Sequence, residues 1–237
     1  MLPLKDLNRT FSTPHINRLL LIMNIVIFTV YFLSTENVVF NVSFANFFMN
    51  DFTMVPSEVL SGQRLFTLFT SMFMHATWVH LLGNMLYLFV FGDNVEDVFG
   101  HAGYLTFYLV CGLAAASAHI LTTLYAPMIN SWTGLTLSPD LTEGLIGASG
   151  AISGVLGAYL VLYPKAYILT IVVVVILPVP AILFLGFWFI LQWLYIIFNM
   201  ATEVAYFAHI GGFVTGMALA LAFGLNRKKA LRQRRRL

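Results

Sequence analysis

Charged side chains are scarce in this chain: 9% of its 237 residues are Asp, Glu, Lys or Arg, and 59% are hydrophobic. Soluble globular domains carry about 25% charged residues, so the composition excludes an ordinary water-soluble domain and favours a polytopic membrane protein. Cysteine is almost missing as well. Cys111 is the single one, so no disulfide can form within the chain, and no histidine shares its local motif to make it a nucleophile.

Basic residues are few and unevenly distributed. Seven of the 12 Lys and Arg residues lie in the tail from Arg227 to Arg236, and Lys5, Arg9 and Arg18 precede the first apolar run. Cytoplasmic segments collect Lys and Arg, so we expect both termini in the cytoplasm and an even number of spans. A basic tail could also bind nucleic acid, but we expect membrane lipid as its partner and no nucleic acid.

Six apolar segments predict an all-α bundle of six transmembrane helices, since a span needs about 20 apolar residues. The β-branched run at 167–177 ends at Pro178 and Pro180, so we interpret it as an interfacial or re-entrant segment rather than a seventh span. The first loop, about residues 34–75, is rich in phenylalanine and is expected to lie at the membrane interface. The expected spans are roughly residues 19–33, 78–91, 104–125, 144–163, 181–197 and 204–225.

The predicted organisation has three parts. Residues 1–18 form a cytoplasmic N-terminal segment, residues 19–225 a six-helix domain, and residues 226–237 a basic cytoplasmic tail. The composition and the spans predict an integral, multi-pass protein, which we expect in the plasma membrane of a prokaryote.

Two short polar motifs interrupt the apolar runs: GASG around Ser149 and AHIGG around His209. A hydroxyl and an imidazole are costly to hold at membrane depth, which favours a functional role. Together they supply a nucleophile and a base, the minimum set for covalent hydrolysis. Each follows an acidic residue, Glu143 or Glu203, by six positions. On parallel helices this spacing puts both about 9 Å below one membrane surface and predicts a hydrogen bond between them.

Small residues surround this pair. Gly150 and Gly154 are four residues apart, as are Gly212 and Gly216, and this spacing lets helix backbones approach closely. Gly147 is assigned to the same helix-packing set. The alternative, that these motifs serve packing alone while Ser149 bonds to its own helix, stays open at this point.

A second polar group lies at the start of the second expected span. His80 and Asn84 are four residues apart and share one helix face, where they could donate hydrogen bonds to the negative oxygen that develops in acyl transfer. They could equally be polar residues satisfied at the membrane interface. His75 is about 140° away round a helix, and no acidic residue completes a metal-binding motif, so we expect no metal site.

Taken together, these motifs resemble the rhomboid family of intramembrane serine proteases. The resemblance includes HATWVHLLGN at 75–84, FGDNVED at 91–97, YLVCG at 108–112, GASG and AHIGG, and covers most of the chain from about Gly62 to Gly216. It implies a six-helix bundle with a water-filled cavity, a catalytic dyad of Ser149 and His209, and no cofactor. It also implies an oxyanion site of His80, Asn84 and the Ser149 N–H, with His75 in support, and transmembrane proteins as substrates.

Two positions depart from the family pattern. Arg64 follows Gln63 where many relatives have a Trp-Arg pair, and it lies further from His75 than expected. Ser153 stands where some relatives place an aromatic residue against the histidine. Substrate access would come from the lipid side, with the aromatic residues of span five as candidates for a lateral gate against span two and residues 199–202 as a cap. These candidates are Phe187, Trp188 and Trp193, and each is equally well explained as a lipid-facing aromatic.

Two other functions remain open. A non-catalytic rhomboid-like protein would keep the fold and bind membrane clients. A small transporter would need ionisable groups along a path through the bilayer, whereas the polar cluster here lies on one side. The oligomeric state is not predicted.

Overall fold

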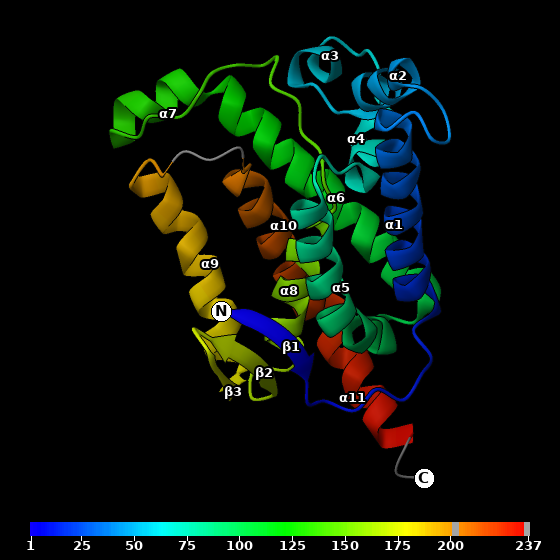
Figure 1. Cartoon of the computed structure of the whole chain (residues 1–237). Coiled ribbons are helices and arrows are strands. Elements are labelled where there is room, and N and C mark those ends of the chain that lie inside the picture. The colour runs from blue at the N-terminus through cyan, green and yellow to red at the C-terminus, as the bar shows by residue number, and fades with distance from the viewer. Residues whose placement is uncertain (201–203, 235–237) are drawn as a thin grey trace.

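Helices dominate the architecture (Figure 1). The computed structural model describes residues 1–200 and 204–234. The helices are α1 (His15–Thr35), α2 (Val42–Phe52), α3 (Pro56–Leu60), α4 (Thr67–Thr70), α5 (Trp78–Phe99), α6 (His101–Leu124), α7 (Ala126–Thr133), α8 (Ser149–Leu162), α9 (Ala181–Ile197), α10 (Tyr206–Leu219) and α11 (Leu225–Arg234). A 3₁₀ turn, Ser71–Phe73, follows α4, and a π-helical turn, Ala220–Gly224, joins α10 to α11.

Three strands accompany the helices: β1 (Leu2–Asp6), β2 (Tyr167–Val172) and β3 (Val175–Pro180). They lie at one end of the molecule with α11, which we call the sheet end, while α2, α3 and α7 lie at the opposite end, the loop end (Figure 1). The long helices run between these two ends.

Three helices in the described part of the chain are long and apolar enough to cross a membrane: His15–Thr35, His101–Leu124 and the continuous stretch Tyr206–Leu231. A fourth candidate is a broken one, in which Thr67–Phe73 meets Trp78–Phe99 at 93°. The apolar helices α8 and α9 are shorter, with 14 and 17 residues. The molecule is thus an integral membrane protein of helical architecture.

The three-stranded sheet corrects the prediction of an all-α fold. The run expected to be interfacial or re-entrant forms β2 and part of β3, paired as an antiparallel hairpin, and β1 pairs with β2 from the other side. Valine and isoleucine favour extended backbone. Pro178 and Pro180 are tolerated because β3 is an edge strand. The N-terminal segment therefore contributes a strand to the fold.

The acidic residues after the second expected span lie inside a helix, because α5 continues to Phe99 rather than ending near residue 91. The buried Glu96 accepts the backbone N–H groups of Ile16 and Asn17 at 3.0 and 2.7 Å, in the first turn of α1. Asp97 accepts both the N–H and the hydroxyl of Ser12. A helix N-terminus carries unpaired donors and positive potential, so these carboxylates anchor α1 and have a reason to be buried.

At the centre of the bundle is α8, whose residues from Gly150 to Tyr159 are all buried. It packs against α5, α6 and α10. A Cβ atom on Gly212 would collide with the carbonyl oxygen of Gly150, and one on Gly216 would collide with that of Gly154. We call this contact the glycine seam (Gly150, Gly154, Gly212, Gly216). Backbone lies against backbone there, as small residues at this spacing permit.

Candidate functional site

Ser149 and His209 meet at the loop end of the glycine seam. Ser149 is the first residue of α8, and His209 lies in the first turn of α10. The Ser149 Oγ and the His209 Nε2 are 2.9 Å apart, within hydrogen-bond distance. The two helices are parallel partners across the seam, so the backbone contact of the glycines sets the separation of the side chains.

The backbone before Ser149 does not follow the helical path from Glu143 that was expected from the sequence. Residues 143–148 are not helical, so Ser149 does not lie two helical turns below Glu143, and Glu203 falls outside the described residues. Other contacts hold the segment before Ser149 out of a helix: Leu145 bridges to Met54, and the Gly147 N–H donates to the Ser71 carbonyl at 2.8 Å. Ser149 therefore begins α8, whereas His209 is the fourth residue of α10.

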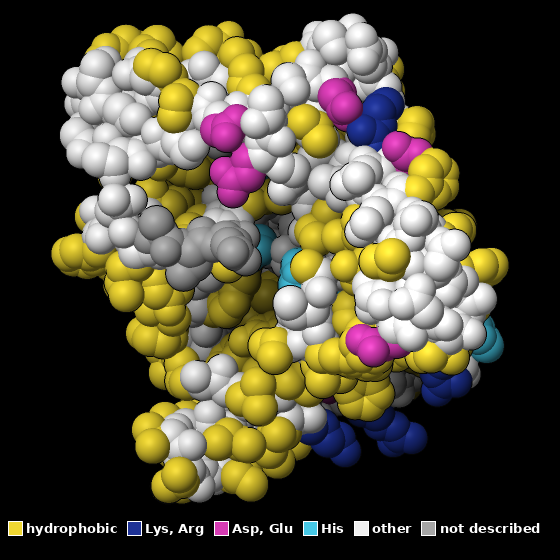
Figure 2. All heavy atoms as spheres, turned by 45° about the horizontal axis from the view of Figure 1, so that its top comes forward, with side chains coloured by type: hydrophobic (Ala, Val, Ile, Leu, Met, Phe, Trp, Pro, Cys, Tyr) yellow, Lys and Arg dark blue, Asp and Glu magenta, His cyan; other side chains and the backbone are white. Residues whose placement is uncertain are grey.

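A recess exposes part of this region to the outside. Figure 2 shows histidine side chains inside a hollow of the face turned toward the loop end, with apolar surface around it. Next to Ser149, a cavity of about 20 Å³ is lined by Ser71, Gly147 and Ala208, among others. One water molecule needs about 10–15 Å³, so this cavity can hold one beside the serine.

His209 has a second partner, Gln192 of α9. The Gln192 Oε1 lies 2.9 Å from the His209 Nδ1, and the Gln192 Nε2 donates to the carbonyl of Trp188 at 3.1 Å. Because the amide nitrogen is occupied by a carbonyl acceptor, the amide oxygen faces the imidazole and accepts from Nδ1–H. The Nε2 of His209 then carries the lone pair and can accept the hydroxyl of Ser149.

Aromatic rings enclose the imidazole. The ring of Trp188 lies 5.9 Å from that of His209, and the ring of Tyr206 lies 6.4 Å away, nearly perpendicular. Ser153 stands where some relatives place an aromatic residue, and its hydroxyl donates to the Ser149 carbonyl at 2.6 Å. The aromatic contact with His209 therefore comes from α9 and α10.

The expected gate of span five against span two needs correction. Trp188 faces α10, where it also stacks on Phe213, and Trp193 contacts Phe207 of α10. Phe187 is exposed. The aromatic contact between α5 and α9 is made instead by Phe184 of α9, whose ring centroid lies 6.4 Å from that of Tyr87 and 6.2 Å from that of Phe91. The proposed cap at residues 199–202 lies partly outside the described residues.

His75, His80 and Asn84 form one group beside Ser149. The Asn84 Nδ2 donates to the His75 Nε2 at 2.8 Å, and the rings of His75 and His80 meet edge to face at 4.9 Å. A Cβ atom on Gly147 would lie 2.7 Å from the His80 Nε2. Gly147 also has a φ of +117°, a backbone conformation suited to glycine. Gly147 is thus a loop residue that makes room for His80, rather than the helix-packing residue predicted.

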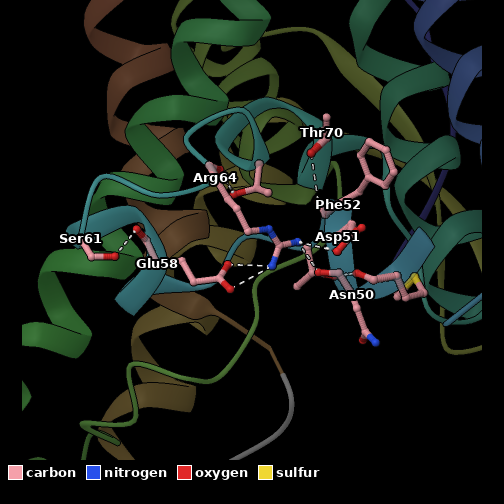
Figure 3. Close-up of polar contacts among 10 residues, drawn as sticks. Asn50, Asp51, Phe52, Glu58, Ser61, Arg64 and Thr70 are labelled. Carbon is pink, nitrogen blue, oxygen red and sulfur yellow. Dashed lines mark hydrogen bonds and ion pairs between the residues drawn. The ribbon is translucent and has the colours of Figure 1, made fainter. Parts of the chain in front are cut away.

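Arg64 holds together the first loop at the loop end of the molecule (Figure 3). Its Nη1 donates to both carboxylate oxygens of Glu58, at 3.0 and 2.8 Å, and its Nη2 donates to the Asn50 carbonyl. Asp51 lies 3.9 Å from the same guanidinium. Because one guanidinium contacts both Glu58 of α3 and Asn50 of α2, Arg64 ties α3 to the end of α2. Arg64 thus orders the first loop even though Gln63, and not tryptophan, precedes it.

Gln192 is the site residue whose role the sequence analysis missed. It is a polar residue inside the otherwise apolar run 181–197, and buried polar side chains in membrane segments mark functional sites. That signal was present, but the partner could not be identified because α9 and α10 are joined by a segment whose path the sequence does not determine.

Comparison with known proteins gives the family. The family model described as Rhomboid domain matches residues 62–226. The chain is 32% identical over 168 residues to RHOMBOID-like protein 12, mitochondrial, of Arabidopsis thaliana, covering 70% of this chain and 48% of that protein. It is 31% identical over 167 residues to Rhomboid protease AarA of Providencia stuartii, covering 65% of this chain and 54% of that protein.

The chain spans about half the length of the curated relatives that it matches. A third relative is Rhomboid protein 1, mitochondrial, of Saccharomyces cerevisiae, at 27% identity, 72% of this chain and 44% of that protein. With mitochondrial proteins among these relatives, the expected location in a prokaryotic plasma membrane is not supported. The match of the family model over 165 of the 237 residues is conclusive at the level of the family: the chain belongs to the rhomboid family.

Proposed function

We propose that this protein is an intramembrane serine endopeptidase that hydrolyses peptide bonds in or near transmembrane helices of other proteins. The observation that carries the proposal is the 2.9 Å contact between the Ser149 Oγ and the His209 Nε2, beside a small cavity in a membrane protein. A nucleophile and a base at this distance are what covalent hydrolysis requires. The rhomboid membership and the similarity to a protein named as a protease support the same conclusion.

The first chemical step is acylation of Ser149. His209 Nε2 takes the hydroxyl proton as the serine oxygen attacks the substrate carbonyl, and the imidazolium then gives that proton to the departing amine. Water next attacks the acyl-enzyme with His209 again as base, which releases the carboxylate product and restores the serine. The cavity beside Ser149 has room for that water.

Negative charge on the substrate oxygen needs donors in both steps. The Ser149 N–H is one of the first four N–H groups of α8, which have no partner within the helix. His80 and Asn84 lie beside it, and Asn84 is held by its hydrogen bond to His75. We assign the Ser149 N–H, His80 and Asn84 to the oxyanion site and give His75 the role of fixing the Asn84 amide.

Gln192 completes the arrangement as a positioning residue. Its Oε1 accepts from the His209 Nδ1–H, which keeps the Nε2 lone pair directed at Ser149 and stabilises the imidazolium that forms during acylation. Its own amide is fixed by the Trp188 carbonyl one helical turn earlier. The catalytic pair thus has an uncharged third member supplied by α9.

The proposal includes an arrangement of the helices in the membrane. Six spans would be formed by α1, α5, α6, α8, α9 and the continuous α10–α11 helix, with the sheet end and both termini in the cytoplasm, as the basic residues favour. The short α8 is compatible with a span because residues 134–148 lead the chain down to Ser149. Residues 1–18 and 226–237 would flank a domain of residues 19–225. The substrate bond would then lie toward the non-cytoplasmic side, in a helix weakened by glycine or proline.

Cleavage of a fluorescently labelled transmembrane substrate in liposomes tests the proposal. The wild-type protein should cleave, and Ser149→Ala and His209→Ala should not, while both variants keep the thermal unfolding midpoint of the wild type. Cleavage by Ser149→Ala would refute the mechanism. If the wild type binds the substrate helix without cleaving it and Ser149 does not react with a fluorophosphonate, the protein is a non-catalytic client binder.

A further inference from the structure

A cleft in the described part of the molecule lies at the sheet end, and Ser149 is not among the residues that line it. It has a volume of about 590 Å³ and is bounded by the end of α8, the connection to β2 and the start of α11. Asn8 of the N-terminal segment also reaches it. None of the roles assigned above uses this cleft, although it is far larger than the cavity beside the serine.

Three lysines from two segments of the chain line the cleft. Lys165 belongs to the connection after α8, and Lys228 and Lys229 to the first turn of α11. The described residues that line the cleft include no carboxylate. Basic side chains are also seen gathered at the sheet end in Figure 2. The site therefore has the charge to take a singly or doubly negative group such as a phosphate.

Lys228 is held in place rather than left to move in solvent. Its ammonium donates to the carbonyl of Leu162, at the end of α8, and lies 3.4 Å from the centre of the Tyr163 ring. Cation–π contact and a helix C-terminus both favour a positive charge there. A fixed ammonium loses less conformational freedom on binding a ligand than a mobile one, which makes the cleft a partly preorganised site.

Apolar surface continues from the cleft along the membrane helix. Leu225 lines the cleft and is 41% exposed, and Leu221, four residues earlier, is 57% exposed. Both lie within the stretch Tyr206–Leu231, which is apolar enough to cross a membrane. A soluble phosphate compound would not need this surface, whereas the acyl chains of a phospholipid would cover it.

We propose that this cleft binds one anionic phospholipid, with the headgroup phosphate among Lys165, Lys228 and Lys229 and the acyl chains along Leu225 and Leu221. The lipid would join the end of α8 to the start of α11, so it would brace the side of the glycine seam opposite to Ser149 and His209. This role does not depend on the proposed catalytic activity.

Native mass spectrometry of the purified full chain tests the proposal by counting bound lipids. The wild type should bind a first phosphatidylglycerol more tightly than phosphatidylcholine with the same acyl chains. The variant K165Q/K228Q/K229Q should weaken the first phosphatidylglycerol by about 100-fold, since each lysine near an anionic lipid contributes about fivefold. K165Q/K229Q, which keeps the Lys228 contact with α8, should weaken it by about 25-fold.

The matched control is K5Q/R9Q/R18Q, which removes the same charge from exposed residues of the N-terminal segment that do not line the cleft. It should change the first binding step by about twofold at most, because charges outside the site act through screened, longer distances. Equal losses in the two triple variants would overturn the proposal. So would competition by glycerol phosphate at the same concentration as the lipid, because that result would identify a soluble phosphate ligand.

Discussion

Two of the helices that pack against α10, α8 and α9, contact it in different ways. Toward α8, glycine faces backbone: Gly212 lies on the Gly150 carbonyl and Gly216 on that of Gly154. Toward α9, side chain faces side chain, with stacked pairs such as Phe189–Phe213 at 4.6 Å and Tyr195–Tyr206 at 5.2 Å. Backbone contact cannot adjust without moving a helix, whereas aromatic side chains can change rotamer.

This difference assigns separate tasks to the two sides of His209. The glycine seam fixes the distance from His209 to Ser149, the pair that would do chemistry. The side toward α9 carries Gln192 and Trp188, which orient the imidazole. These two residues belong to a helix that contacts α10 through side chains rather than through backbone. A substrate helix entering beside α9 could therefore displace that helix and leave the Ser149–His209 distance unchanged.

The largest effect is expected from breaking the glycine seam. Gly216→Leu places a side chain where the Gly154 carbonyl lies, and overpacking against backbone should cost about 3 kcal/mol or more. Thermal unfolding in detergent should show a strongly lowered midpoint, and cleavage should be lost. Gly186→Ala on α9 is the control, because nothing lies within 4 Å of its Cβ position. An unchanged midpoint in Gly216→Leu would contradict the rigid seam.

A smaller effect, confined to catalysis, is expected at Gln192. Gln192→Ala removes the acceptor for His209 Nδ1–H, and a hydrogen bond to a charged group contributes about 1.5–3 kcal/mol. Turnover should fall by about 10- to 100-fold with KM unchanged. Gln192→Glu, which keeps an acceptor, should recover much of kcat. Should KM rise while kcat stays constant, Gln192 would act on substrate binding instead.

Trp188 should matter less than Gln192. Trp188→Ala removes a ring that packs 5.9 Å from the imidazole, and aromatic contacts of this kind contribute about 0.5–1.5 kcal/mol. Turnover should fall by about two- to tenfold. Phe187→Ala, at the adjacent and exposed position, should stay within about twofold of the wild type. Equal losses of turnover in Trp188→Ala and Phe187→Ala would mean that the ring packed against His209 contributes no more than the exposed ring beside it.

The smallest effect is expected at the sheet end of α8, where Asp6 accepts from Tyr159 at 2.9 Å and from Asn94 at 2.7 Å. Burial raises the pKa of the Asp6 carboxyl from 3.8 to about 6, with a further contribution from Asp93. The folded state therefore holds the proton more tightly than the unfolded state. The contribution of Asp6 to stability is greatest below about pH 4 and declines as pH rises to about 6.

The matching variant is Asp6→Asn, which cannot ionise. Its unfolding midpoint, measured from pH 4 to pH 7, should decline less with rising pH than that of the wild type. An identical pH dependence in both proteins would mean that the Asp6 carboxyl keeps its ordinary pKa in the folded state.

The contact between Ser149 and His209, the proposed catalytic pair, could be anticipated from the sequence, but not by the geometry first assumed. Two polar motifs in apolar surroundings pointed to Ser149 and His209, and the structure brings them together. The helical spacing expected from Glu143 to Ser149 was wrong, because residues 143–148 are not helical and are held by contacts with Met54 and Ser71. Those partners are about 75 to 95 residues away in sequence, and no local pattern encodes such pairing.

The pairing of the sheet and the partner of Gln192 could not be predicted for the same reason. β2 pairs with β1 across more than 160 residues, so its β-branched residues revealed a preference but not a partner. The expected second span stopped at residue 91, before the acidic residues of α5, because buried carboxylates are unusual. Their burial depends on the first turn of α1, a distant partner. Local chemistry was readable from the sequence, whereas long-range pairing was not.

Reaction with a fluorophosphonate tests the central claim most directly, because it needs a nucleophile and its base but no knowledge of the natural substrate. The purified wild-type protein should form one adduct, mapped by mass spectrometry to Ser149. His209→Ala should react at least about 100-fold more slowly, since general-base assistance contributes on the order of 10²–10⁴. Labelling at the same rate in wild type and His209→Ala, or no adduct at Ser149, would contradict the account of a Ser149–His209 pair fixed by the glycine seam.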